Sequence, residues 1–415
     1  METLELMEKA MKKSEQSIHL VASESWLPGE VRLPYLLDAY SRYVYDVEEN
    51  VQKDENGLAE TLPQFGGTEE YIEIETRCKN MLCEYLGGKY ANVKPLSGLN
   101  MMISVVGSLV MKNELVLSVP IEAGGHSATK YVIERIGCKH EFIPYDKGSY
   151  NIDKEALEKL VNEKKVKMVY IDLMNVIYRA DIEGIRKIVG KNVMICYDAS
   201  HVLGLIMGGQ FQNPLKEGAD IIIGSTHKTF PGPHKGIFVT TNRWYYMLYQ
   251  LNHMLFISHT HTADICSLAM VLEKGEKFFS EYAAKVVENA RTLAERLRDN
   301  GMRIYYDTSH QLWIDCGMND ITENVNYCIE NGIYVNSITI PHNGHNGVRI
   351  GVQEVTYLGF EKNDMHVLGD IIAKFFIKED SEETRSKMAE LLQKQKEKKS
   401  LEYAKLFTQI DRVLR

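Results

Sequence analysis

The stretch VMICYDASHVLGL (193–205), followed soon by ADIIIGSTHKTFPGPHKG (219–236), decides the fold. Each part opens with a short apolar run rich in β-branched residues and passes into a polar segment, which holds Asp198 in the first and Lys228 in the second. Similar runs, separated by helical stretches, are LVLSVP (115–120), EFIPYD (141–146), KMVYIDL (167–173) and GIFVTT (236–241). Strands that alternate with helices predict an α/β fold, with a largely parallel sheet covered on both faces.

The flanking regions differ in character from this core. A helix is expected over 68–86, where Gly87-Gly88 is a good stop signal, and a long helix over 262–300 with a break near Gly275. The runs LWIDCG (312–317) and GVRIGV (347–352), with a helix between them, indicate a smaller α+β unit. We therefore divide the chain into an N-terminal helix and arm (1–66), a large domain (67–275), a small C-terminal domain (276–378) and a charged helical tail (379–415).

Composition excludes several classes of function. The 415 residues carry 48 basic and 57 acidic side chains, a net charge of −9, which argues against a nucleic-acid or anionic-membrane partner. The seven cysteines form no C-x-x-C pair, so a reducing compartment is expected and no metal site is predicted. The N-terminus lacks the apolar core of a secretory signal, and no run reaches the roughly 20 apolar residues of a membrane span. We expect a cytoplasmic protein.

Four polar groups follow the carboxyl ends of predicted strands or open the helices beyond them. They are Asp198, Lys228, the Ser97-Gly98 pair and His126 in GGH. Each alone is more typical of a cap, a turn or a solvated side chain. In an open α/β sheet, however, ligands bind beyond the carboxyl ends of the strands, so the four together indicate one site.

Six segments carry a resemblance to a known family. They are VASESW (21–26), KYANVKPLSG (89–98), EAGGHSATK (122–130), YDASHVLGLI (197–206), GSTHKTFPGPHKG (224–236) and GVRIGVQEVTYLGF (347–360). In order and spacing they resemble segments of serine hydroxymethyltransferase. The resemblance implies a pyridoxal-phosphate (PLP) transferase of fold type I, with a mostly parallel seven-stranded sheet in the PLP-binding large domain. It also implies a homodimer with shared active sites.

The resemblance gives each catalytic residue a role. Lys228 is expected to hold PLP as a Schiff base, which requires a partly neutral amine and therefore a lowered pKa. Asp198 is expected to pair with the pyridine nitrogen and keep it protonated, so that the ring withdraws electrons from Cα. His126 is expected to stack on the ring and His201 to lie near its phenolic oxygen. Thr226, two residues before the lysine, completes the catalytic set.

The resemblance also assigns the phosphate and the substrate. Ser97 and the backbone of Gly98 are expected to bind phosphate at a helix N-terminus, although Leu99 stands where the family has a second hydroxyl. Arg349 is expected to grip the substrate carboxylate with its guanidinium fork, with Ser23 in support. Further expected cofactor contacts are Thr226, His227, Asn175 in place of a family serine, and Thr262 from the partner chain.

The chain departs from the family where folate binds. The family run E-G-Y-P-G-x-R-Y-Y-G-G reads NGLAETLPQFGG (56–67) here, so Gly57 replaces the glutamate and Phe65 the second tyrosine. Candidates for the missing acid are Glu55, Glu60 and Glu69, and register does not choose among them. Ser127 stands where the family has a leucine beneath the folate ring. Pro231 and His234 stand where the family has two arginines after the lysine.

These changes predict a folate-independent enzyme that acts on a β-hydroxy amino acid such as threonine or serine. The expected chemistry is aldol cleavage, or transfer of the glycyl unit to an aldehyde co-substrate. The alternatives are a true serine hydroxymethyltransferase, another PLP reaction such as decarboxylation, elimination or racemisation, and a non-catalytic scaffold. Fold alone does not decide among reactions.

Overall fold

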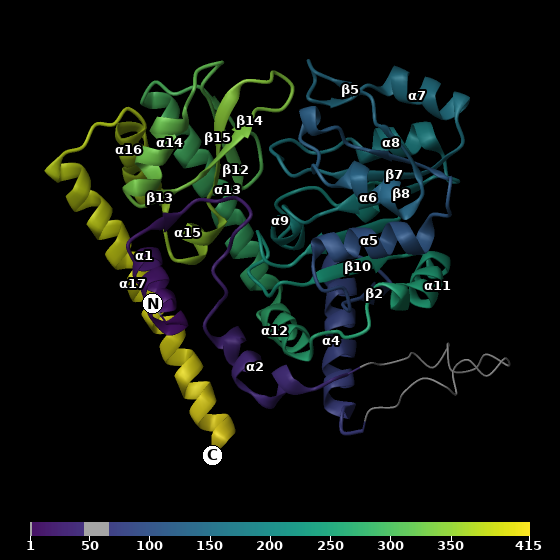
Figure 1. Ribbon diagram of the computed structural model, residues 1–415, viewed down its shortest axis with the longest axis horizontal. Coiled ribbons are helices and arrows are strands. Elements are labelled where there is room, and N and C mark those ends of the chain that lie inside the picture. Colours follow the sequence, from purple (N-terminus) through teal and green to yellow (C-terminus); the bar gives the residue numbers. More distant parts are fainter. Residues whose placement is uncertain (1, 45–65) are drawn as a thin grey trace.

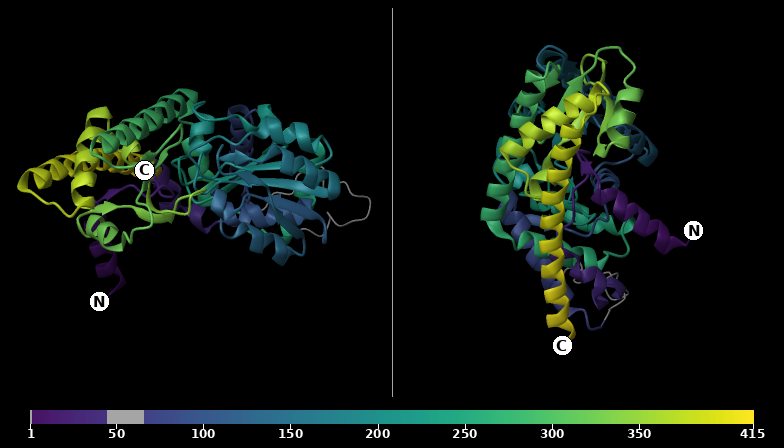
Figure 2. Two further views of the ribbon diagram at one scale, coloured as in Figure 1. Left: turned by 90° about the horizontal axis from the view of Figure 1, so that it is seen from above. Right: turned by 90° about the vertical axis from the view of Figure 1, so that its left-hand side faces the viewer.

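The computed structural model describes residues 2–44 and 66–415. At its centre lies a seven-stranded sheet, visible edge-on in Figure 2. In spatial order its strands are β2 (Tyr90–Asn92), β10 (Gly236–Thr240), β9 (Ile221–Ser225), β8 (Met194–Asp198), β7 (Val166–Asp172), β3 (Leu115–Ser118) and β4 (Lys139–Phe142). β10 runs antiparallel to both of its neighbours, and the other neighbouring pairs are parallel. The predicted mostly parallel, seven-stranded sheet is confirmed.

Alternate residues of the inner strands, from β10 to β3, enter two separate hydrophobic cores, which explains why these strands are largely apolar. In β9, Ile222 joins the larger core with α4, α8 and α13, whereas Ile221 and Ile223 join the core under α5, α6 and α11. A sheet buried on both faces in this way has no polar side to expose. Figure 1 shows these covering helices. They are α4 (Glu69–Leu86), α5 (Gly98–Leu109), α6 (Thr129–Ile136), α7 (Lys154–Glu163), α8 (Ile182–Val189), α9 (Leu203–Met207), α10 (Pro214–Glu217), α11 (Arg243–Asn252) and α13 (Gly275–Asp299).

A second, antiparallel sheet lies toward the C-terminus. Its strands, in order, are β11 (Ile304–Tyr305), β12 (Gln311–Asp315), β15 (Asn346–Gly351) and β14 (Asn336–Thr339). The expected break near Gly275 is present, since α12 (Thr262–Leu272) ends just before it and Gly275 has a φ of +85°. Helices of this region are α14 (Thr322–Glu330), α15 (Gln353–Tyr357) and α16 (Lys362–Phe376). The boundaries at 66, 275 and 378 stay predictions.

The N-terminal arm lies against the middle of the long C-terminal helix (Figure 1). The arm starts with α1 (Thr3–Glu15) and β1 (Ile18–His19), which pairs with β13 (Ile333–Tyr334). The long terminal helix α17 (Glu382–Leu414) packs on this arm: Gln395 Nε2 donates to the Ser17 carbonyl at 3.1 Å. Its backbone also comes so close that a Cβ on Gly29 would lie 2.2 Å from the Glu402 carbonyl oxygen.

The remaining short elements are connectors. They are η1 (Glu30–Arg32), α2 (Leu33–Leu36), η2 (Asp38–Ser41), η4 (Ile121–Ala123), β5 (Tyr145–Asp146), β6 (Asn151–Ile152) and η5 (His253–Leu255). All seven cysteines fall in the described residues, and none of them forms a disulfide there. Within 2–44 and 66–415, no helix has both the length and the apolar character to cross a membrane. In the same ranges, no cluster of three or more His, Cys, Asp or Glu side chains is arranged to bind a metal.

Candidate active site

A narrow cavity lies at the carboxyl edge of the central sheet, where β7, β8 and β9 end. We call it the Lys228 cavity. It is enclosed by the start of α5, the turn that holds His126, the ends of β7 and β8, and Lys228 in the connection from β9 to β10. Its lining residues are Gly98, Leu99, Met102, His126, Asp172, Leu173, Met174, Asp198, Ser200, His201 and Lys228.

The Lys228 amine is buried, which disfavours its charged form. Burial lowers the pKa of Lys228 to about 8; the negative charge of Asp198 opposes this shift and the positive charge of Arg349 adds to it. Its Nζ lies 3.3 Å from His201 Nε2. A substantial fraction of this amine is therefore neutral near physiological pH, as covalent bonding to a carbonyl requires.

The hydrogen bonds of His201 favour the same neutral amine. Gln311 Oε1 accepts from the Val176 amide at 3.2 Å, so Gln311 Nε2 is the donor to His201 Nδ1, also at 3.2 Å. Burial lowers the pKa of His201 well below its usual value, so the ring is neutral. With Nδ1 accepting, its proton lies on Nε2 and points at Lys228, whose nitrogen must accept.

Asp198 is held in a fixed orientation by two donors. The Ser200 amide donates to Oδ1 at 2.9 Å, and the Tyr170 hydroxyl donates to Oδ2 at 3.0 Å. Tyr170 is fully buried on the neighbouring strand β7, which leaves it little freedom to move. The carboxylate is thereby pre-oriented toward the cavity that also contains Lys228.

His126 lies on a turn that is tied to the end of β7. The Gly124 carbonyl accepts from the amides of Met174 at 2.9 Å and Asn175 at 3.1 Å. Gly124 has a φ of +96°, and a Cβ there would lie 2.5 Å from the Asn175 carbonyl oxygen, so this position requires glycine. His126 Nδ1 accepts from the Ala128 amide at 3.2 Å, and burial lowers the pKa of the ring. A neutral, planar ring therefore faces the cavity.

The start of α5 offers an anion site. Ser97 caps the helix, accepting from the Asn100 amide at 3.1 Å, and the first amides of a helix have no partner within it. A Cβ on Gly98 would lie 3.1 Å from Ser225 Cβ and 3.3 Å from Ser200 Oγ, so a side chain here would crowd both serines. Ser225 Oγ is buried and has no hydrogen-bond partner among the described residues. Ser200 and Ser225 thus place hydroxyl groups beside Gly98, next to Leu99, which has no hydroxyl of its own.

Arg349 joins the small sheet to the end of β7. Its Nη1 donates to Asn175 Oδ1 at 3.0 Å and to the Met174 carbonyl at 3.1 Å, and its Nε donates to Asn336 Oδ1 at 3.3 Å. Burial lowers the pKa of Arg349 to about 10, which still leaves it charged at neutral pH. It lines a second cavity of about 600 Å³, which we call the Arg349 cavity.

Five expected site residues do not line either cavity: Ser97, which caps α5 as described above, and four others. Thr226 Oγ1 donates to the Pro233 carbonyl at 2.6 Å and so braces the turn after Lys228. His227 stacks on His234 with 4.0 Å between ring centroids. Thr262 donates to the Arg42 carbonyl at 3.0 Å. Ser23 is half-buried on the arm. The roles assigned to these residues stay predictions.

The candidates for the missing acid are only partly described. Glu55, Glu60, Gly57 and Phe65 lie outside the described residues. Glu69 is exposed at the first position of α4 and lines neither cavity. Sequence reasoning also missed Asp172, Ser200 and Gln311. Asp172 ends a predicted strand just as Asp198 does, so the same rule would have found it.

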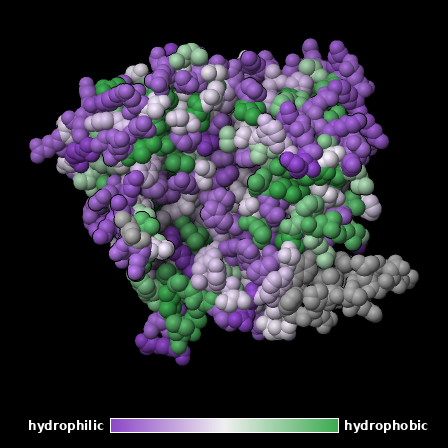
Figure 3. Space-filling model, viewed as in Figure 1, coloured by the Kyte–Doolittle hydropathy of each residue, from purple (hydrophilic) through white to green (hydrophobic). Residues whose placement is uncertain are grey.

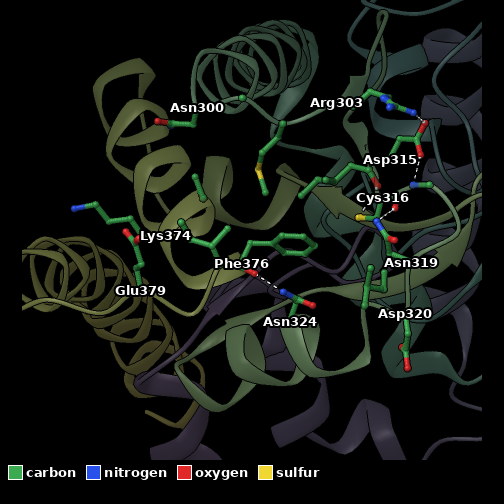
Figure 4. A pocket seen from close by; sticks show the side chains of 17 residues that line it. Asn300, Arg303, Asp315, Cys316, Asn319, Asp320, Asn324, Lys374, Phe376 and Glu379 are labelled. Carbon is green, nitrogen blue, oxygen red and sulfur yellow. Dashed lines mark hydrogen bonds and ion pairs between the residues drawn. The ribbon is translucent and has the colours of Figure 1, made fainter.

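A third cavity belongs to neither site. It measures about 770 Å³ and lies beside β12 and α16 in the C-terminal region (Figure 4). Its buried acid, Asp315, is already bonded to Arg303 at 3.3 Å and to His345 Nδ1 at 2.9 Å. The Asn324 amide is bonded to the Phe376 carbonyl at 2.6 Å. These paired polar groups serve the local structure, so we do not assign chemistry to this cavity.

Comparison with known proteins identifies the family. A sequence model of serine hydroxymethyltransferase matches residues 1–372. The chain belongs to the serine hydroxymethyltransferase family. The predicted resemblance is therefore confirmed, together with the fold-type I architecture of these PLP-dependent enzymes.

Relatives in this family include enzymes with two named activities. A serine hydroxymethyltransferase of Pyrobaculum aerophilum is 30% identical over 396 residues, covering 91% of this chain and 89% of its own. An L-threonine:uridine-5'-aldehyde transaldolase of a Streptomyces species is 30% identical over 372 residues, covering 86% and 88%. The crystal structure of L-threonine transaldolase from Pseudomonas fluorescens, in its internal aldimine state, superposes with a TM-score of 0.85 at 26% identity. It covers 94% of this chain and 90% of that one.

The Lys228 cavity fits the cofactor of this family. It offers a partly neutral lysine for the aldehyde, an oriented carboxylate for the ring nitrogen, a flat neutral histidine, and a helix N-terminus with the unpartnered Ser225 hydroxyl for the phosphate. These groups differ in chemistry and all stand around one cavity. The residues present therefore match the chemical groups of PLP.

Proposed function

We propose that this protein is a PLP-dependent enzyme that transfers the glycyl unit of a β-hydroxy amino acid to an aldehyde without folate. One observation carries the proposal: the buried amine of Lys228 shares a cavity with the oriented carboxylate of Asp198, and Arg349 lies within the electrostatic reach of that amine. When bound, PLP supplies an electron sink that weakens one bond at the Cα of an amino acid. The rest of the chemistry falls to the side chains of the chain.

Lys228 is the proposed covalent anchor, and Asp198 the partner of the ring nitrogen. His126 would cover one face of the ring and exclude water there. The amides at the start of α5, with Ser97 and the hydroxyls of Ser200 and Ser225, would hold the phosphate. His201 would orient the Lys228 nitrogen through its Nε2 proton.

Arg349 is the proposed clamp for the substrate carboxylate. Two of its nitrogens are held by Asn175, Met174 and Asn336, and its Nη2 makes no hydrogen bond within the described residues. A fixed guanidinium with a free edge suits a carboxylate and decides which Cα bond stands perpendicular to the ring.

The Arg349 cavity is the proposed site of the acceptor aldehyde. At about 600 Å³ it falls in the size range of small-molecule pockets. Its polar side chains include Glu122, Lys147, Asn175, Asn336, His342 and Asn343. One transaldolase relative is named for threonine and uridine-5'-aldehyde. A bulky aldehyde of that size supports the assignment of a cavity this large to the acceptor.

Product analysis tests the proposal. The purified protein, loaded with PLP, is incubated with threonine and a panel of aldehydes. We expect acetaldehyde release and a new β-hydroxy amino acid, both lost in Lys228→Ala. Carbon dioxide or ammonia as product would favour another PLP reaction. A strict requirement for tetrahydrofolate would favour a true serine hydroxymethyltransferase, which the relative from Pyrobaculum aerophilum keeps as the second candidate.

A second copy of the chain is proposed to complete the site. Leu99, at the edge of the Lys228 cavity, is exposed, as are Leu255 of η5 and Tyr40 of η2. Figure 3 shows apolar side chains gathered over α5 and α11 on the same molecule. An obligate dimer interface of several thousand Å² would cover such a surface. Light scattering that finds a cofactor-loaded monomer would overturn this proposal. A cytoplasmic location, expected from the cysteine pattern of the sequence, is also proposed.

A further inference from the structure

A second carboxyl stands in the Lys228 cavity. Asp172 is the last residue of β7, and it lies in register with Asp198 on the adjacent parallel strand β8. It is 3% exposed and lines the cavity together with Lys228. Two acids are thus placed side by side at the end of the sheet where a PLP ring nitrogen needs one.

The contacts of Asp172 lead to the His126 turn rather than to a cation. Thr129 Oγ1 donates to Asp172 Oδ2, and the backbone amide of His126 faces the same carboxyl. Thr129 is buried at the start of α6, three residues after His126. Asp172 Oδ1 is buried and has no hydrogen-bond partner among the described residues. Asp172 therefore ties the turn to β7 and leaves one oxygen free.

The surroundings of Asp172 do not favour a second negative charge. The titratable groups whose charges couple to it are Asp198, Tyr170, Cys196 and Tyr145, all acidic groups. Among the described residues that line the cavity, the cation is Lys228, which already interacts with Asp198. Burial raises the pKa of Asp172 well above its usual range; the bonds from Thr129 and from the backbone amides oppose this shift, and the charge of Asp198 adds to it. Two neighbouring carboxyls resist ionising together, and Asp172 is the more deeply buried of the two, since Asp198 is only half-buried.

We propose that Asp172 is a positioning residue, a neutral carboxylic acid that fastens the His126 turn to β7 and leaves Asp198 as the single negative charge at that end of the cavity. Its role in cofactor binding rests on the proposed function. Its protonation state does not, because it is a property of the folded chain alone.

The first test measures the unfolding equilibrium of the cofactor-free protein against pH, for the wild type and for Asp172→Asn. A carboxyl whose folded pKa is raised costs stability once the pH exceeds its unfolded pKa, and the cost grows until the folded pKa is reached. Asparagine has no proton to lose. We therefore expect the unfolding constant of the wild type to rise with pH, relative to Asp172→Asn, by up to about tenfold per pH unit, starting above the unfolded pKa of an aspartate near 4. A ratio that does not change with pH would show that Asp172 is ionised and would overturn the proposal.

The second test measures PLP affinity by absorbance titration of the cofactor-free protein. Asp172→Asn keeps an acceptor for Thr129 and is expected to bind PLP within about threefold of the wild type. Asp172→Ala and Thr129→Val remove the tie, and both are expected to weaken binding about tenfold, whereas Thr129→Ser, which keeps the hydroxyl, is the matched control. Weakening in Asp172→Asn equal to that in Asp172→Ala would overturn the positioning role. If even Lys228→Ala leaves the spectrum unchanged, the cofactor assignment fails, while the pH result for Asp172 still stands.

Discussion

The reactivity of the Lys228 amine at neutral pH follows directly from its burial. With a pKa lowered to about 8, roughly one amine in ten is neutral at pH 7. An ordinary lysine, with a pKa near 10.4, is neutral in about one molecule in 2,500 at that pH. The neutral form of Lys228 is therefore about 250 times more abundant than that of an exposed lysine, which sets the upper limit of its gain in rate with an amine reagent at equal access.

Brief labelling of the cofactor-free protein between pH 5.5 and 10, followed by peptide mapping, measures this directly. The labelling rate of the Lys228 peptide should rise to a midpoint near pH 8. Asp198→Asn removes the charge that stabilises the ammonium form, so the midpoint should move to lower pH; Arg349→Met removes a cation and should move it higher. A midpoint near pH 10 in the wild type, or identical midpoints in all three proteins, would refute the assigned electrostatics.

Three further substitutions test the geometry. Gly124→Ala places a Cβ 2.5 Å from a carbonyl oxygen at a φ of +96° and should lower the free energy of unfolding by about 3 kcal/mol. Gly87→Ala, at a φ of +73° and a ψ of 24° with nothing within 4 Å, is its control and should cost about 1 kcal/mol; equal costs would contradict the close approach. Arg349→Lys keeps the charge but loses the fork, so the KM for the amino acid should rise at least about tenfold with a smaller change in kcat. Gln311→Leu leaves the Val176 amide and His201 Nδ1 without their partner and should lower the free energy of unfolding by about 2 kcal/mol, measured by calorimetry. No loss would show that Gln311 does not orient the His201 ring.

The sequence predicted those site residues whose position follows from the local pattern of strands and turns. Apolar strands and the polar residues after them identify the edge of the sheet, and this placed Asp198 and Lys228 in one cavity with Gly98 and His126. It did not predict which side chains of an irregular turn face inward. Thr226 and His227 precede Lys228 directly, yet both face other partners.

Contacts between distant segments were beyond such reasoning. Gln311 reaches His201 from the other sheet, and no local signal links residues 110 positions apart. Asp172 was missed for a different reason. The sequence showed an acid at a strand end, but only the register of β7 against β8 shows that it lies beside Asp198.

The packing of α17 on the arm has a consequence for biosynthesis. The Ser17 carbonyl and Gly29 meet Gln395 and Glu402, which are synthesised long after the arm. The arm also passes alongside the Arg349 strand, where the Gly351 amide donates to the Leu20 carbonyl at 2.8 Å, so it cannot settle until these later segments have been made. The central sheet can form earlier, while the arm still waits for its C-terminal partners.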